Sequence, residues 1–263
     1  MVDFTKIELF LKEEIPFFEA QSMVDTKDII SDLIYSNDRG IYLLSGETGV
    51  GKSRLIKSIV DEVDEDVFLI TEPPKLERDF LEDTYLQLRK KQFSKNVKID
   101  EMRIRVNDAF KKINHTIIID NIGEIQTSLI KEIGKHLEDI KDLKIILVFD
   151  RVFENSEDIK TLFSFEVKEN FEIKPISQED LKEFLSKSLI NLNIEKEIRA
   201  ILSNFDFVYK ITDGNFLKFN NLLSTVFDIL STAEKENLDK FKNLNECVLI
   251  MSALENELVD GEK

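Results

Sequence analysis

One stretch of the chain has residue types and spacing that suit it to binding an anion. It reads GETGVGKS and matches the pattern G-x-x-x-x-G-K-[ST] in full. Gly46, Gly49 and Gly51 allow backbone conformations that a β-carbon would obstruct, so successive amides can point inward at phosphate oxygens. The Lys52 ammonium can reach the β and γ phosphates of a nucleotide, and the Ser53 hydroxyl can ligate Mg²⁺. The pattern predicts a phosphate-binding loop.

The elements around this loop are the ones that its chemistry needs. Residues 41–44 form a short apolar run before it, and apolar residues at helical spacing follow it from Leu55 to Val63. A helix that begins near Lys52 adds its positive dipole end to the loop. A glycine-rich turn could match the pattern by chance, but this one lies between a strand and a helix. We therefore expect the chain to bind ATP with Mg²⁺. The residues expected to contact the nucleotide are Gly46, Glu47, Thr48, Gly49, Val50, Gly51, Lys52, Ser53 and Arg54.

A second candidate residue follows an apolar run. Residues 116–120 read TIIID, which is typical of a buried parallel strand that ends on Asp120. The carboxyl ends of such strands form the edge at which α/β sheets bind ligands. An Asp after an apolar run is common by chance. The position of Asp120 downstream of the phosphate-binding loop makes a chance match rarer. We expect Asp120 to be the Walker B residue that holds Mg²⁺ opposite Ser53.

The remaining pattern divides the chain into an α/β part and a helical part. Strands are predicted at 41–44, 67–70, 116–120, 144–149 and 171–173, and helices around 25–34, through most of 75–112 and at 129–140. A helix-start signature at Ser177 opens a part in which every segment is helical by period, at 194–206, 215–231 and 244–258. We predict a nucleotide-binding α/β domain at 1–174, with a helical N-terminal lead-in, and a C-terminal helical lid domain at 175–263.

Composition limits the classes of function. The formal net charge of −16 over 263 residues argues against broad, non-specific binding of nucleic acid. A single cysteine, Cys247, forms no intrachain disulfide and suits a reducing cytoplasm. No run approaches the roughly 20 apolar residues of a membrane span, and acids within the first apolar stretch argue against a signal peptide. We expect a cytoplasmic protein, with peripheral attachment to the inner membrane left open.

One segment, residues 89–112, runs against this acidity, and we call it the basic island. Its cations are Arg89, Lys90, Lys91, Lys95, Lys98, Arg103, Arg105, Lys111 and Lys112, against Asp100, Glu101 and Asp108. Such a segment could bind an acidic partner, a lipid or nucleic acid, whereas a solvated helix face and loop is the commoner explanation.

Several landmarks together carry a resemblance to a known family. They are Pro16-Phe17, RGIYLLSGETGVGKS at 39–53, TIIID at 116–120, KIILV at 144–148, FEIKPISQEDL at 171–181 and ITDGNFLKFNNLL at 211–223. Their order resembles the AAA+ P-loop ATPases, and within them the GspA/ExeA (MshM, TniB-like) ATPases of secretion, pilus and transposition systems. The resemblance implies an α/β fold, a P-loop NTPase (AAA+) three-layer sandwich with a parallel five-stranded sheet ordered 5-1-4-3-2. A small all-helical lid domain follows in that family, with nucleotide between the two domains.

The chain departs from that family at the residues that speed hydrolysis. AAA+ ATPases usually have a Glu after the Walker B Asp, and here the residue is Asn121. An amide can orient water but cannot accept its proton, and general-base help is worth roughly 10²–10⁴ in rate. Glu124 could substitute if its loop folds back. The resemblance therefore gives Lys52, Asp120 and Asn121 as the catalytic candidates.

Three further positions differ from the family pattern. Asp150 stands at the polar sensor position after the fourth strand, where a carboxylate beside phosphate needs Arg151 or Mg²⁺ to offset it. Glu166 stands where the family has an arginine that reaches a neighbouring subunit's nucleotide. The lid arginine corresponds to Leu217, and the adjacent Lys218 is rotated by about 100° on a helix, so Lys218 could bind phosphate or simply be solvated.

These features predict an ATP-binding module with slow hydrolysis, a nucleotide-dependent switch or assembly factor. We expect protein partners in a membrane-associated secretion, pilus or DNA-uptake machine, because the net charge is negative and no DNA-reading motif is present. The alternatives are a nucleic-acid accessory ATPase that uses the basic island, either DnaA-like or transposition-targeting, and a scaffold that binds nucleotide without turnover. Without an interface arginine we expect a monomer or a weak, ATP-dependent oligomer.

Overall fold

The structure is a computed structural model. It describes residues 7, 11, 20–63, 67–72, 74–110, 116–122, 125, 127–137, 143–150, 167–188, 192 and 194–259. The chain forms two compact units. We call Asp25–Thr48 with Lys52–Ile173 the sheet unit, and Met1–Val24 with Gly49–Gly51 and Lys174–Lys263 the helical unit.

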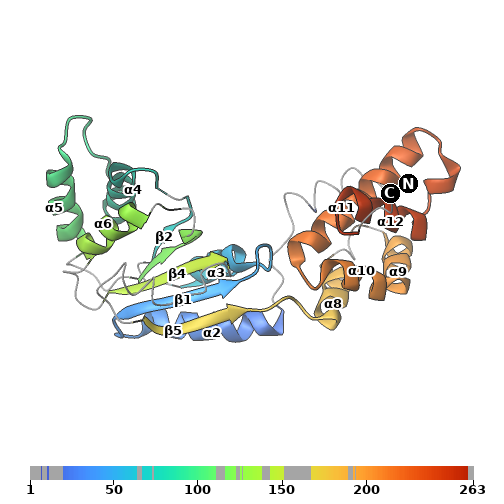
Figure 1. Cartoon of the computed structure of the whole chain (residues 1–263), viewed down its shortest axis with the longest axis horizontal. Helices are drawn as coiled ribbons and strands as arrows, with labels where there is room; N and C mark the ends of the chain where they lie inside the picture. Colours follow the sequence, from blue (N-terminus) through green and yellow to red (C-terminus); the bar gives the residue numbers. More distant parts are fainter. Residues whose placement is uncertain are drawn as a thin grey trace. The chain divides into compact units, whose positions relative to one another are not determined.

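The sheet unit is built on five parallel strands in the order β2-β3-β4-β1-β5 (Figure 1). The strands are β1 (Gly40–Gly46), β2 (Val67–Ile70), β3 (Thr116–Ile119), β4 (Lys144–Asp150) and β5 (Val167–Ile173). The central strands β1, β3 and β4 are almost continuously apolar and buried along their length, as strands covered on both faces must be. The order and the direction confirm the sheet that the resemblance implies.

β5 is longer than the predicted strand at 171–173. It begins at Val167, and the polar residues Lys168, Glu169 and Asn170 within it are exposed. Among the described strands, β5 lies at the edge of the sheet and pairs with β1. An edge strand can carry polar side chains, so the apolar pattern marks only its buried end.

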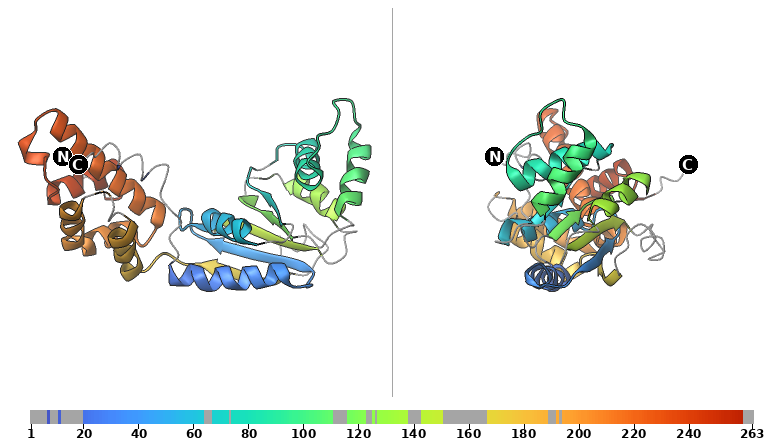
Figure 2. Two further views of the ribbon diagram at one scale, coloured as in Figure 1. Left: turned by 180° about the vertical axis from the view of Figure 1, so that it is seen from behind. Right: turned by 90° about the vertical axis from the view of Figure 1, so that its left-hand side faces the viewer.

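Before β5, the described residues form the helices α2 (Gln21–Tyr35), α3 (Lys52–Glu62), α4 (Glu77–Arg89), α5 (Ile99–Phe110) and α6 (Thr127–Leu137). The predicted helical region at 75–112 is thus two helices joined by a loop. α4, α5 and α6 pack together beside β2 (Figures 1 and 2). Phe80, Met102 and Phe110 from these helices share one core with alternate residues of the strands, such as Ile117 and Ile145.

A buried lysine connects the end of α2 to the start of β4. Lys144 is 2% exposed, and its ammonium donates to the carbonyls of Ile34 and Ser36, the latter at 2.6 Å. The last carbonyls of a helix have no partner within the helix, and a cation suits the negative end of its dipole. Lys144 therefore caps α2 while it begins the strand that ends on Asp150.

The helical unit contains α8 (Gln178–Ser188), α9 (Glu195–Ser203), α10 (Phe205–Thr212), α11 (Phe216–Lys235), a 3₁₀ turn (Asp239–Phe241) and α12 (Glu246–Glu255). The sequence does not predict α10, because FDFVYKIT is rich in aromatic and β-branched residues that favour strands. It is a helix whose Phe205, Val208 and Thr212 are buried on one face. Phe219 of α11 makes edge contacts with Phe184 and Phe205, each with ring centroids 6.2 Å apart. Among the described residues, no helix is both long and apolar enough to cross a bilayer.

Candidate functional site

The predicted phosphate-binding loop connects the end of β1 to the start of α3. β1 ends on Gly46 and α3 begins at Lys52. Gly49 has φ +87° and Gly51 has φ +107°, backbone angles that L side chains rarely adopt. The two glycines are therefore required by the path of the loop, and the loop delivers the chain to the positive end of the α3 dipole.

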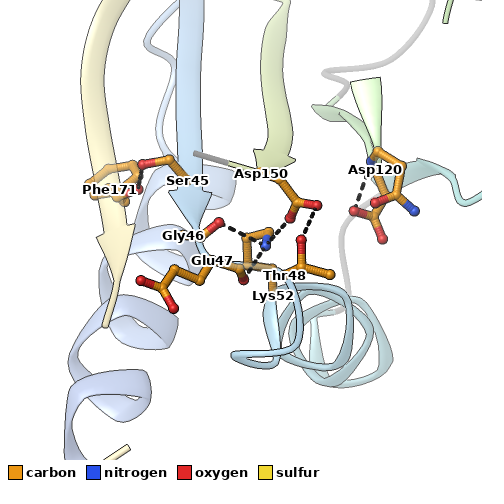
Figure 3. Close-up of polar contacts among 9 residues, drawn as sticks. Ser45, Gly46, Glu47, Thr48, Lys52, Asp120, Asp150 and Phe171 are labelled. Atoms are coloured by element: carbon orange, nitrogen blue, oxygen red, sulfur yellow. Dashed lines mark hydrogen bonds and ion pairs between the residues drawn. The ribbon is translucent and has the colours of Figure 1, made fainter. Parts of the chain in front are cut away.

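Three acceptors hold the side-chain ammonium of Lys52 against the loop. The lysine is 6% exposed, and its Nζ donates to the Gly46 carbonyl at 3.1 Å and to the Glu47 carbonyl at 2.8 Å. The third acceptor is Oδ1 of Asp150, at 2.6 Å (Figure 3). The ammonium thus lies where the loop could present it to a phosphate, and its present anionic partner belongs to the protein.

Asp150 reaches the loop because of the sheet register. It is the last residue of β4 and lies opposite Gly46 in the parallel pairing of β1 with β4. Its Oδ2 accepts a hydrogen bond from Thr48 Oγ1 at 2.6 Å (Figure 3). Burial raises the pKa of the Asp150 carboxyl, but the hydrogen bonds from Lys52 and Thr48 and the charge of Lys52 outweigh it, so the pKa is lowered. The expected neighbour Arg151 lies outside the described residues, and among those that are described Lys52 forms the ion pair with this carboxylate.

Asp120 follows β3 at the same edge of the sheet. It is 4% exposed, its amide donates to the Ile70 carbonyl at 3.0 Å, and its Oδ1 accepts from the Asn121 amide at 2.9 Å. Asn121 has φ +52°, a left-handed conformation that Asn tolerates better than most residues. The strand therefore ends in a turn that buries the carboxylate of Asp120 next to an asparagine with a left-handed backbone.

The residues present fit Mg²⁺ together with a nucleotide. Ser53 lies exposed in the first turn of α3, and Asp120 supplies a buried carboxylate at the ligand edge of the sheet. Among the described residues, no group of three or more His, Cys, Asp and Glu side chains could hold a metal ion. Mg²⁺ in nucleotide sites takes most of its ligands from water and phosphates, so one hydroxyl and one carboxylate are the expected protein contribution.

The other predicted site residues are placed as follows. Val50 is buried and Arg54 is exposed. Lys218 lies in the first turn of α11 in the helical unit, with its amide capped by the Asn215 side chain at 3.2 Å, so its contact with nucleotide stays a prediction. Glu124 and Glu166 lie outside the described residues. The contact of Asp150 with Thr48 and Lys52 was not predicted from the sequence. The signal that could have revealed it is that β1 and β4 both end at the ligand-binding edge of the sheet.

Comparison with known proteins agrees with this geometry. A protein-family model described as AAA domain matches residues 35–155, a range that includes the loop, Asp120 and Asp150. No curated protein sequence matches the chain.

Solved structures share the fold at low sequence identity. The Aeropyrum pernix ORC2 protein in ADPNP–ADP complexes has a TM-score of 0.67 at 15% identity, over 97% of this chain and 72% of that one. The Aeropyrum pernix ORC1 protein in complex with DNA has a TM-score of 0.64 at 13% identity, over 94% and 69%. Domain III of the Thermotoga maritima replication initiation protein DnaA has a TM-score of 0.56 at 18% identity, over 91% and 94%. The chain therefore has the P-loop NTPase fold of the AAA+ ATPases.

Proposed function

We propose that the chain binds Mg·ATP through the loop at 46–53 and hydrolyses it slowly, as a nucleotide-dependent switch or assembly factor. The observation that carries the proposal is a contrast between the residues that would bind the nucleotide and the residue that would activate the attacking water. Lys52 and Asp120 are both buried at the ligand edge of the sheet, whereas the residue after Asp120 is an amide in a left-handed turn. Ser53 and Asp120 would hold Mg²⁺, which supplies Lewis-acid polarisation of the phosphoryl oxygens.

Slow turnover follows from the chemistry of Asn121. Its side-chain amide can hydrogen-bond a water molecule, but it cannot take the proton that the water must lose. General-base assistance contributes about 10²–10⁴ in rate. The chain therefore keeps the groups that bind the nucleotide and lacks, at this position, the group that would speed its hydrolysis.

Two measurements test the proposal. Calorimetric titration with Mg·ATP should give binding to the wild type and none to Lys52→Ala. Steady-state turnover should be slow in the wild type and should rise in Asn121→Glu, with circular dichroism as a check that the variant folds. Brisk turnover by the wild type that disappears in Asn121→Ala would contradict the slow switch.

A switch must also distinguish ATP from ADP, because a ligand shifts an equilibrium only by its different affinity for two states. We expect unequal thermal shifts with the two nucleotides. Equal shifts would support the scaffold that binds nucleotide structurally. Light scattering should find a monomer or a weak oligomer that needs ATP, and a stable hexamer without nucleotide would contradict this part.

The finer proposal concerns the partner. The landmarks at 171–181 and 211–223 and the strong net acidity support a protein partner in a secretion, pilus or DNA-uptake machine. Affinity capture from the native organism with the wild type and Lys52→Ala, each with ATP or ADP, tests this. Components retained by the wild type with ATP only would support it, and recovery of nucleic-acid enzymes alone would contradict it.

A nucleic-acid accessory function is the second candidate, and a specific surface favours it. In the loop between α4 and α5, Phe93 stacks on Tyr85 with ring centroids 4.2 Å apart, and Val97 is 9% exposed and part of the core. The loop is thus anchored by apolar residues. The exposed cations on this loop and on the last residue of α4 are Arg89, Lys90, Lys91, Lys95 and Lys98. Within the part of the chain that the structure describes, none of these five forms an ion pair.

The rest of the basic island is partly neutralised. Arg103 pairs with Glu77 and Asp100, and Arg105 pairs with Glu101, while Lys111 and Lys112 lie outside the described residues. The candidate surface is therefore narrower than the sequence predicts. It is confined to the last residue of α4 and the α4–α5 loop, residues 89–98.

Salt dependence tests this candidate. About four or five phosphate contacts give a slope near −4 in log affinity against log salt, at about −0.9 per contact on duplex DNA. Lys90→Glu with Lys91→Glu should abolish binding. The matched control is Lys131→Glu with Lys135→Glu on exposed positions of α6, which makes the same charge change and should retain binding. Undetectable or salt-insensitive binding by the wild type would remove the candidate.

A further inference from the structure

Lys52 has no donor left for a phosphate in this structure. A lysine ammonium has three N–H donors, and the three acceptors are the carbonyls of Gly46 and Glu47 and the carboxylate of Asp150. The distance to Asp150 is the shortest of the three, 2.6 Å. A phosphate oxygen that accepts a hydrogen bond from Lys52 must replace one of these acceptors.

Asp150 contacts the loop in the way that a bound phosphate would. It carries negative charge, and its two oxygens accept from two different loop residues, Lys52 Nζ and Thr48 Oγ1, both at 2.6 Å. Figure 3 shows the carboxylate facing both donors, whereas the Glu47 side chain points away from Lys52. Two short hydrogen bonds donated to one carboxylate, one of them by a charged donor, make a strong contact.

The contact is also one that can be broken. The Asp150 side chain is 41% exposed, whereas that of Lys52 is 6% exposed. The carboxylate can therefore turn toward solvent about its side-chain torsions, and the lysine has no such freedom. When the two separate, Asp150 is the partner that leaves.

We infer that Asp150 is an internal competitor of the nucleotide phosphates, which holds Lys52 and Thr48 in the nucleotide-free protein and thereby lowers the affinity of the loop for ATP. This inference rests on the proposed binding of nucleotide at the loop. It assigns to Asp150 the role of an affinity-determining residue: its charge must be displaced from Lys52, or offset by Mg²⁺, before a triphosphate can bind. An anion beside the phosphates opposes their binding even after it has turned away.

The experiment measures the affinity of Mg·ATP in three proteins by calorimetry: the wild type, Asp150→Asn and Asp150→Glu. Asn keeps the shape and one acceptor oxygen but removes the charge, and charge-assisted bonds are roughly twice as strong as neutral ones. We expect Asp150→Asn to bind Mg·ATP about tenfold more tightly, which corresponds to about 1.4 kcal/mol. Asp150→Glu restores the carboxylate and should bind with an affinity close to that of the wild type.

A second readout separates competition from a general change of charge. Asp150→Asn should lower the melting temperature of the nucleotide-free protein and increase the shift that Mg·ATP produces, because ligand stabilisation grows with affinity. Glu169→Gln is the matched control. It removes one negative charge from an exposed position in β5 of the same sheet, and it should leave the affinity unchanged.

Each outcome decides the matter. An unchanged or weaker affinity in a folded Asp150→Asn overturns the inference while the wild type still binds, and the proposed function then stands. A gain in Glu169→Gln equal to that in Asp150→Asn also overturns it, since the effect would be one of net charge. No binding to either the wild type or Asp150→Asn overturns the inference together with nucleotide binding at the loop.

Discussion

Replacing Lys144 by Met should destabilise the sheet unit without touching the candidate site. The ammonium of this 2% exposed lysine donates to the carbonyls of Ile34 and Ser36 at the end of α2. Methionine has similar length and no donor, so Lys144→Met leaves both carbonyls without this partner. Where no glycine cap closes the end of a helix, side-chain donors of this kind satisfy its last carbonyls.

The magnitude follows from two hydrogen bonds made by a charged donor. Each is worth about 1.5–3 kcal/mol. The variant is spared the cost of burying an ammonium, which offsets part of the loss. We therefore expect the free energy of unfolding of the sheet unit to fall by about 2–3 kcal/mol. Lys131→Met, at an exposed position of α6, is the control and should change it by about 0.5 kcal/mol or less.

Urea unfolding followed by circular dichroism is the assay, because the chain has no tryptophan to report by fluorescence. Lys144→Met should lower the urea midpoint at an unchanged slope. Hydrogen exchange should speed up in α2 and β4 more than in the helical unit. A midpoint equal to that of the wild type would refute the reasoning, since the carbonyls would then not depend on Lys144.

The remaining predictions concern the site and the α4–α5 pair. The pKa of the Asp150 carboxyl is lowered from its ordinary value of 3.8. Its contacts therefore stabilise the fold above the unfolded-state pKa, and this stability is lost as the pH falls through the lower folded-state pKa. The difference in urea midpoint between the wild type and Asp150→Asn should be full at pH 7 and shrink below about pH 4. Asn121→Gly should retain or slightly raise stability, measured by thermal melting, whereas Asn121→Val should lower it by about 1–2 kcal/mol, because residue 121 has φ +52°. Arg103 donates two bonds to Glu77, at 2.6 and 2.7 Å, so Arg103→Met should lower the melting temperature by an amount equivalent to about 1 kcal/mol; an unchanged melt would mean that the pair is fully screened by solvent.

The elements that local pattern can specify were predicted well. The strands β2 and β4 begin where the apolar runs begin, at Val67 and Lys144, because a buried parallel strand must be apolar on both faces. The loop at 46–53 was predicted from its glycines and Lys52, since those residue types have few other uses at that spacing. β5 was predicted only at its buried end and α10 was missed, because an exposed edge strand and a short aromatic helix carry no distinctive pattern.

The sequence by itself determined that a glycine-rich loop would lie between a strand and a helix, with Lys52 at its end and Asp120 after a second buried strand. Only the tertiary structure decided that Asp150, which is 98 positions from Lys52, is the anion that Lys52 holds. The physical reason is that the parallel register of β1 and β4 places Gly46 opposite Asp150. That pairing depends on how the strands are ordered in the sheet, and no local spacing in the chain records it.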